Sequence, residues 1–429
     1  MLKRCPEHGN SKVLIADDVA YYKNIRNYNK PSEIPYKFNT KTHYGCPYDC
    51  GLCPDHEQHS CLTVVEITDR CNLSCPTCYA GSSPTYGRHR TLEEVKEMLN
   101  AIVINEKEPD VVQISGGEPT LHPQFFEILD YAKTLPIKHI MLNTNGIEIA
   151  KDVEFAKRLA TYAPDFEIYL QFDSFKEPAL LCLRGASLTK IREKALEHLN
   201  ALNLSTTLVV TLQKGLNDDE IGAIIDFALQ QKCVRGVTFQ PTQIAGRLTN
   251  FNPETDRITL TEVRRKILEQ APIFTSDDLI PVPCNPDALV MGYVLKVEGE
   301  YLPLTRYINP ADLLDSSRNT IVYEQDEVLH QKMFEIFSTG TSTDKASDTL
   351  HNLLCCLPFV EAPQLDYNNL FRIIIMQFVD AYNFDVRAIK KSCVHIVNKD
   401  NKIIPFETMN LFYRDDKVAY LDRLKAGLF

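Results

Sequence analysis

The stretch Cys71-Asn-Leu-Ser-Cys75-Pro-Thr-Cys78 decides how this chain is interpreted. It follows a strand-like apolar run, residues 62–69, and spaces three thiols as C-x3-C-x2-C. Three thiolates on one short loop can bind three irons of a four-iron cubane, and they leave the fourth iron without a protein ligand. Closed zinc sites use four protein ligands, so the alternative is a three-cysteine zinc site that a distant residue completes.

A second motif, Ser115-Gly-Gly-Glu-Pro-Thr120, follows the strand-like run 110–114. The chain strongly resembles the radical S-adenosylmethionine (SAM) superfamily, because it has a cysteine loop after one strand and Gly-Gly-Glu-Pro after the next. One departure is that Thr77 precedes the third cysteine, where the family often has an aromatic residue, and Tyr79 follows it instead. The resemblance implies a [4Fe–4S] cluster on Cys71, Cys75 and Cys78 with an open iron site that SAM chelates.

The same resemblance implies which residues contact SAM. The Gly-Gly-Glu-Pro strand would receive the SAM amino group, because its glycines let backbone approach a ligand closely and its glutamate is an acceptor for an ammonium. Gln171 and Asp173 match positions that bind the ribose or methionine end, and Arg184 suits the carboxylate, which arginine binds bidentately. The expected cofactor-binding residues are Tyr79, Gly116, Gly117, Glu118, Pro119, Asn145, Gln171, Asp173 and Arg184.

Strands and helices alternate along the middle of the chain. The expected strands are 62–69, 110–115, 138–146, 166–173, 206–212 and 236–241, and the expected helices are 91–104, 122–133, 153–162, 188–202 and 218–231. Such alternation favours an α/β fold with a parallel sheet, here a partial (β/α)6 barrel like the radical SAM core, with its chemistry at the carboxyl ends of the strands. We expect a Cys-rich N-terminal segment at 1–61, the barrel at 62–247 and an α+β C-terminal segment at 248–429. In that last segment, 369–382 is an apolar helix or strand and 394–406 a hairpin.

Seven further cysteines are candidate metal ligands. Cys46, Cys50 and Cys53 repeat the C-x3-C-x2-C spacing upstream of the barrel, and we interpret them as ligands of an auxiliary [4Fe–4S] cluster with Cys61 as the fourth. The alternative is a structural zinc that uses His56, His59 or Cys61. Cys284, Cys356 and Cys393 are candidates for a second auxiliary cluster, against the alternative that they are buried free thiols.

The composition limits partners and location. With 46 Lys+Arg, 57 Asp+Glu and a net charge of −11, the chain lacks the basic balance of a nucleic-acid binder. No apolar run reaches the roughly 18 residues that span a bilayer, and residues 1–9 carry no signal-peptide stretch. We predict a cytoplasmic protein with no transmembrane segment, compatible with peripheral membrane contact. In a reducing compartment, 14 cysteines point to metal rather than to disulfides.

A narrower resemblance concerns the activity. The runs 46–80, 284–289 and 393–406 resemble the tetraether lipid synthase-like group, whose homologues include pterin-methylating enzymes. This implies reductive cleavage of SAM to a 5′-deoxyadenosyl radical that abstracts hydrogen from an unactivated C–H bond. The expected outcome is C–C bond formation or alkylation of a lipid-like substrate, with a flavodoxin- or ferredoxin-type reductant. The alternatives are modification or methylation of a small molecule such as a pterin or of a peptide, and a non-catalytic iron–sulfur electron carrier.

Overall fold

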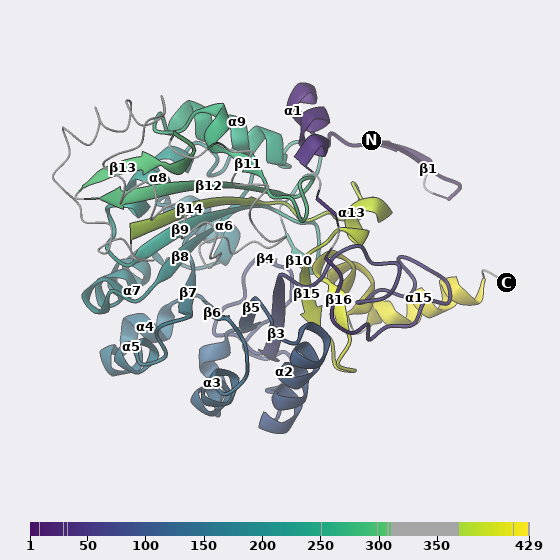
Figure 1. Ribbon diagram of the computed structural model, residues 1–429, viewed down its shortest axis with the longest axis horizontal. Helices are drawn as coiled ribbons and strands as arrows, with labels where there is room; N and C mark the ends of the chain where they lie inside the picture. Colours follow the sequence, from purple (N-terminus) through teal and green to yellow (C-terminus); the bar gives the residue numbers. More distant parts are fainter. Residues whose placement is uncertain are drawn as a thin grey trace, which may run out of the picture.

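The computed structural model describes residues 1–7, 9–28, 30–31, 33–249, 251–297, 299–306, 309, 369–414 and 416–427. Six parallel strands form the centre of the main sheet in chain order (Figure 1). They are β3 (Leu62–Thr68), β5 (Val111–Gly116), β6 (His139–Thr144), β7 (Phe166–Gln171), β8 (Thr206–Leu212) and β9 (Val234–Pro241). Each is almost continuously buried, as expected of a parallel sheet covered on both faces. The predicted partial barrel is confirmed.

Helices follow each strand and pack on one face of the sheet. They are α2 (Leu92–Glu106), α3 (Phe125–Lys133), α4 (Ile147–Lys151), α5 (Val153–Ala160), α6 (Glu177–Arg184), α7 (Thr189–Leu202) and α8 (Ile221–Gln230). The side chain of Thr91 caps α2 and that of Glu94 bonds back to the Thr91 amide, which is the predicted capping box. The short helices α4 and α6 are not among the predicted elements, because neither is long enough to show a helical period.

The C-terminal segment extends the same sheet at both edges. At one edge, β14 (Leu370–Met376) pairs in parallel with β9, and β12 (Leu289–Val297), β11 (Ile280–Pro281) and β13 (Glu300–Pro303) follow it. At the other edge, β15 (Val394–Val397) pairs in parallel with β3, and β16 (Ile403–Pro405) completes the predicted hairpin. The ambiguous run 369–382 therefore contains a strand. The division into 62–247 and 248–429 stays a proposal, since one 12-stranded sheet crosses it.

The remaining elements are short or peripheral. The ordinary strands and helices are β1 (Leu2–Cys5), β2 (Gly9–Lys12), α1 (Val19–Asn24), β4 (Thr77–Cys78), β10 (Arg247–Leu248), α9 (Leu260–Gln270), α13 (Val386–Lys390), α14 (Phe406–Thr408) and α15 (Asp416–Ala426). Single 3₁₀ turns span Ile25–Tyr28, Pro119–Leu121, Ser276–Asp278 and Leu304–Arg306, and a π-helical turn spans Met409–Tyr413. In the described parts of the chain, every helix is too short or too polar to cross a bilayer.

The sheet separates two apolar clusters, because successive side chains of a strand point to opposite faces. On β3, Val65 and Ile67 pack under the helices, whereas Leu62 and Val64 point to the inner side of the curved sheet. The inner cluster also contains side chains of β14 and β15. The cluster under the helices contains further side chains of β12, β14 and β15, so both sides of the sheet join the barrel to the C-terminal segment.

Candidate active site

One cavity opens at the carboxyl ends of the central strands, where chemistry was expected. Its wall contains Cys71, Cys75 and Cys78 together with Gly116, Glu118, Asn145, Gln171 and Arg184. Counted out to its mouth, the space amounts to about 1300 Å³. This volume includes open solvent at the mouth of the cavity.

The three cysteines of the loop are spaced widely. In the described part of the chain, their three sulfur atoms do not all lie within 4.8 Å of one another. Thiolates on a cubane bind different iron atoms and need this wider spacing. Burial raises the pKa of Cys71 to about 12, so metal binding there must displace protons. The donor set fits a [4Fe–4S] cluster with one iron unligated by the loop.

Residues from distant segments hold the cysteine loop in place. Cys78 pairs with Arg247 across the two short strands β4 and β10. The guanidinium of Arg247 donates to the carbonyls of Cys75 (2.6 Å) and Ser82 (2.6 Å). The side-chain amide of Asn145 donates to Asn72 Oδ1 at 2.7 Å, and this bond ties the loop to the end of β6. Arg247 was not predicted, because no local pattern links it to a loop 170 residues earlier.

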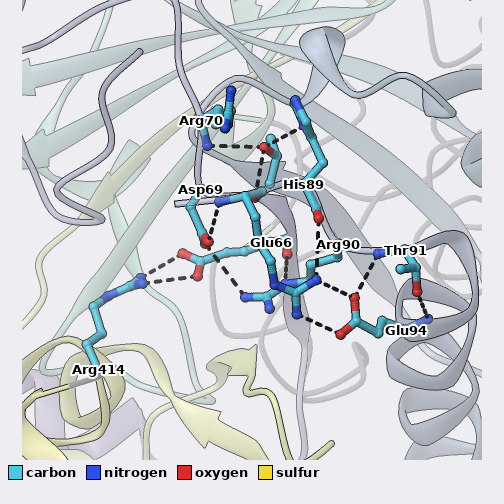
Figure 2. A network of polar contacts seen from close by, with 10 residues as sticks. Glu66, Asp69, Arg70, His89, Arg90, Thr91, Glu94 and Arg414 are labelled. Atoms are coloured by element: carbon cyan, nitrogen blue, oxygen red, sulfur yellow. Dashed lines mark hydrogen bonds and ion pairs between the residues drawn. The ribbon is translucent and has the colours of Figure 1, made fainter. Parts of the chain in front are cut away.

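A polar network fixes the strand that leads into this loop (Figure 2). The Arg414 guanidinium donates to both carboxylate oxygens of Glu66, at 3.1 and 2.6 Å, and Arg90 Nε donates to the Glu66 carbonyl at 2.5 Å. Arg414 also lies 5.5 Å from the ring centre of Tyr79. Tyr79 lines the cavity, as expected, with its ring 4.9 Å from that of Phe406. The C-terminal segment thus supports the base of the site.

The Gly-Gly-Glu-Pro strand has a different role from the one expected. A Cβ on Gly116 would lie 2.2 Å from the Thr68 carbonyl oxygen, and one on Gly117 would lie 2.1 Å from that of Arg70. The amides of Gly117 and Glu118 donate to these two carbonyls, both at 2.8 Å. The glycines are therefore required by the close approach of the backbone that enters the cysteine loop, and not only by a ligand.

The Glu118 carboxylate lies at the cavity wall, and its expected role as an acceptor for the ammonium of SAM stays a prediction. Its two oxygens already accept hydrogen bonds from Thr120, from the Thr144 hydroxyl (2.8 Å) and from the Asn145 amide (2.8 Å). It is 1% exposed, and burial raises its pKa. Glu118 is thus a positioning residue that joins the ends of β5 and β6. Pro119 begins a 3₁₀ turn and is not part of the cavity wall.

Asp173 and Arg184 form a buried cluster beside the cavity. Arg184 donates to both Asp173 oxygens (2.8 and 2.6 Å), and Arg192 donates to one of them at 2.7 Å. Burial alone would raise the pKa of Asp173, but the two guanidiniums hold it at about 2. Asp173 is fully buried and is not among the residues of the cavity wall, and its contact with SAM stays a prediction. Its carboxylate orients Arg184, which lines the cavity with Gln171.

The rest of the cavity wall combines carboxamides with aromatic rings. Side chains of Gln113, Asn143, Gln171, Gln240 and Gln243 line it, as do those of Tyr169, Phe378 and Phe406. The rings of Phe378 and Phe406 stack with centres 4.1 Å apart. Sequence analysis missed Gln113, although a polar residue inside an otherwise apolar strand is a usable signal.

The upstream cysteines form a second candidate metal centre. Cys46 Sγ and Cys50 Sγ are 4.0 Å apart. The contact with Cys46 and burial raise the pKa of the Cys50 thiol, and Cys53 lies close enough to contribute to the rise. The hydroxyl of Tyr413 accepts from the Cys50 amide at 3.0 Å, which ties the segment to the C-terminal part of the chain. These three cysteines stay a predicted auxiliary site.

Cys61 does not join that trio as its expected fourth ligand. Its sulfur lies with those of Cys284 and Cys393, all within 4.8 Å of one another, and all three residues are buried. Cys61 thereby belongs with two of the three cysteines that were expected to share a second site. Cys356, the third, lies outside the described residues.

Comparisons with known proteins identify the family to which this chain belongs. The model of the Radical SAM superfamily matches residues 65–228. A 7,8-dihydro-6-hydroxymethylpterin dimethyltransferase of Methanocaldococcus jannaschii is 31% identical, over 96% of this chain and 89% of that protein. The mycofactocin maturase MftC of Mycolicibacterium smegmatis is 29% identical over 38% of this chain and 41% of that protein. A GTP 3′,8-cyclase of Listeria monocytogenes is 28% identical over 42% and 55%.

A solved structure, Streptococcus suis SuiB bound to S-adenosylmethionine, matches with a TM-score of 0.41 and 17% identity, over 49% of this chain and 47% of that chain. The pterin dimethyltransferase is similar along nearly the whole length of both chains, and the family model covers the barrel and both motifs. The family implies a [4Fe–4S] cluster and SAM, which the cysteine loop and its cavity can hold. This chain is an enzyme of the radical SAM superfamily.

Proposed function

We propose that the enzyme methylates or otherwise alkylates a compact, polar, ring-containing substrate of the pterin class by radical chemistry. When bound to Cys71, Cys75 and Cys78, a reduced cluster supplies the electron that splits SAM into methionine and a 5′-deoxyadenosyl radical. The chain's own residues then have three tasks, which are to orient SAM, to hold the substrate and to exclude water.

Arg184 is the residue best suited to hold the SAM carboxylate. Its Nε and Nη2 donate to Asp173 and Thr211. The guanidinium lines the cavity. Burial raises the pKa of the Cys75 thiol, and the charge of Arg184 and its hydrogen bond to that thiol oppose the rise, which places the guanidinium against the cysteine loop. A charge-assisted bond from a fixed guanidinium would set the position of the sulfonium relative to the loop.

The single observation that carries the substrate class is Gln113. It lies on the cavity wall, is 6% exposed, and its carboxamide makes no hydrogen bond to any described residue. Gln171, which is half-buried, also lines the cavity, and its carboxamide likewise makes no hydrogen bond to a described residue. Carboxamides that line a cavity in this way can pair with a ligand that has donors and acceptors along an edge. The nearby aromatic rings of Phe378 and Phe406 suit the flat face of such a ligand.

The name of the Methanocaldococcus relative supports the same class, since that protein is a dihydro-hydroxymethylpterin dimethyltransferase. A long alkyl chain would leave the two amides without partners, so the lipid-like substrate expected first from the sequence is the weaker candidate. The curated relative that matches nearly the whole chain is named for a pterin substrate and not for a peptide, so modification of a peptide is also a weaker candidate.

The test is anaerobic incubation of reconstituted enzyme with SAM, dithionite and 6-hydroxymethyl-7,8-dihydropterin, followed by mass spectrometry. Two SAM molecules and two electrons from dithionite are consumed per methylation. The first SAM should give methionine and 5′-deoxyadenosine, which carries away a hydrogen atom of the pterin, and the second should give its methyl group to the pterin and leave as S-adenosylhomocysteine. Gln113→Leu should keep the uncoupled formation of 5′-deoxyadenosine but lose most of the pterin product, because it removes only the substrate contact. Methyl transfer to, or coupling of, a dialkyl phospholipid in place of the pterin would contradict the proposed substrate class.

A further inference from the structure

The cluster of Cys61, Cys284 and Cys393 lies at the opposite end of β3 from the SAM loop. Cys61 directly precedes β3 and Cys71 follows it, and a strand of seven residues spans about 20 Å at 3.3 Å per residue. Strands β15 and β3 pair with Val394 opposite Leu62, which sets Cys393 beside Cys61, and the Leu62 amide donates to the Cys393 carbonyl at 3.1 Å. The loop between β11 and β12 brings Cys284 to them from a third segment.

The spacing of these sulfurs is that of ligands around one ion. Cys284 Sγ and Cys393 Sγ are 3.4 Å apart, and all three sulfurs lie within 4.8 Å of one another. A tetrahedral ion with metal–sulfur bonds of about 2.3 Å sets its sulfurs about 3.8 Å apart. A cubane would need each thiolate on a different iron, and the three loop sulfurs, unlike these, do not all lie within 4.8 Å of one another. The three sulfurs therefore do not fit the auxiliary [4Fe–4S] cluster expected for them.

His59 is a candidate for the fourth ligand because it lies beside Cys61. Its ring nitrogens are not within 4.8 Å of all three sulfurs, so its side chain must turn toward Cys284 and Cys393 to complete the site. Its Nε2 is 3.5 Å from Cys61 Sγ. Its Nδ1 lies 3.4 Å from Glu106 Oε2, a carboxylate at the end of α2 that is 5% exposed. A metal-bound histidine usually donates its second ring nitrogen to a carboxylate, which fixes its tautomer and orientation. A set of three sulfurs and one nitrogen, with tetrahedral preference and no redox demand, is typical of structural zinc.

We infer that Cys61, Cys284 and Cys393, with His59 as the fourth ligand, bind a single zinc ion that fastens three distant segments of the sheet together. The ion would join the start of β3, the β11–β12 loop and the start of β15. Because no group here touches SAM, the role is structural, and the inference stands whether or not the proposed substrate is correct.

The experiment measures zinc, iron and acid-labile sulfide per chain in anaerobically purified protein. Wild type, Cys284→Ser and His59→Ala are compared with Cys233→Ser, a control in which an equally buried cysteine outside the cluster is changed. The expected result is one zinc in wild type and in the control, less than a tenth of a zinc in Cys284→Ser, and a several-fold lower occupancy in His59→Ala. Iron and sulfide should be equal in all four proteins.

A loss of iron and sulfide in Cys284→Ser would overturn the inference, because it would show a polynuclear cluster. Wild type without zinc would overturn it as well. Zinc X-ray absorption of the wild type does not depend on whether the variants fold. It should show three sulfurs at about 2.3 Å and one nitrogen at about 2.0 Å, and an iron neighbour or a shell of four sulfurs would contradict the assignment of His59.

Discussion

The two ends of β3 carry cysteines of opposite design. At the carboxyl end, Cys71, Cys75 and Cys78 come from one short loop and stand apart around an open cavity. At the amino end, Cys61, Cys284 and Cys393 come from three segments and crowd into a closed, buried group. The comparison teaches that the loop keeps a coordination position accessible for a ligand, whereas the closed group uses its ligands to connect the chain.

The largest expected effect concerns the cysteine loop at the carboxyl end of β3. Changing Cys71, Cys75 and Cys78 together to Ala should abolish formation of 5′-deoxyadenosine from SAM, because the cluster loses all its protein ligands. The melting temperature should change little, since Arg247 and Asn145 still hold the loop backbone. Liquid chromatography and thermal denaturation measure the two outcomes. Residual 5′-deoxyadenosine above the level of boiled enzyme would mean that the cluster lies elsewhere.

Removal of metal from the closed end should have the reverse effect. A zinc chelator applied under mild denaturation should destabilise the protein by on the order of 5 kcal/mol, less than the roughly 10–16 kcal/mol of zinc-finger peptides, because a large core remains. Circular dichroism melts with and without re-added zinc give the measurement. If stability is unchanged while zinc leaves, the ion does not connect the sheet.

The next effect concerns the buried carboxylate behind the SAM pocket. Asp173→Asn leaves Arg184 and Arg192 without their charged partner, and breaking a buried pair in this way costs about 3–5 kcal/mol. We also expect at least a tenfold rise in the dissociation constant of SAM, measured by calorimetry on the reconstituted enzyme. Asp219→Asn, which breaks an exposed pair with Lys176, should cost less than about 1 kcal/mol. Equal effects of the two variants would remove the special role of Asp173.

The smallest expected effect is a pH dependence near the closed end. His56 is fully buried against the Ser392 carbonyl (2.9 Å) and His395 (3.1 Å), and burial lowers its pKa to about 4. Between pH 4 and 6.5 the unfolded chain therefore binds the extra proton, so stability rises with pH, by up to about 3 kcal/mol. Urea denaturation at pH 4.5 and 7 should show a smaller difference for His56→Gln than for wild type. An unchanged difference would assign the pH dependence to other groups.

Much of the barrel is predictable from the sequence, because its signals are local. Apolar runs alternate with amphipathic helices from Leu62 to Pro241, and both motifs follow strands directly. The cysteines of the loop can likewise be predicted from a local pattern, which is their spacing along the chain. What these signals cannot supply is pairing between distant segments, such as β15 with β3 or β14 with β9.

The roles of single residues were harder to predict for the same reason. Asp173 was expected to contact SAM, since it ends a strand at the catalytic edge, and no local pattern shows that two arginines from later helices bind its carboxylate. Cys61 was grouped with its sequence neighbours, and only the register of β3 and β15 brings it to Cys393. Spacing predicts sites built on one loop and fails for sites that tertiary pairing assembles.

The most direct test of the central claim is electron–nuclear double resonance on the dithionite-reduced enzyme with SAM that carries ¹⁵N in its amino group and ¹⁷O in its carboxylate. The account predicts hyperfine coupling of both labels to the cluster spin, because the iron left free by Cys71, Cys75 and Cys78 binds them. Arg184→Ala should weaken the carboxylate coupling and its SAM affinity. A reduced cluster whose spectrum shows no coupling to either label at saturating SAM would contradict the account.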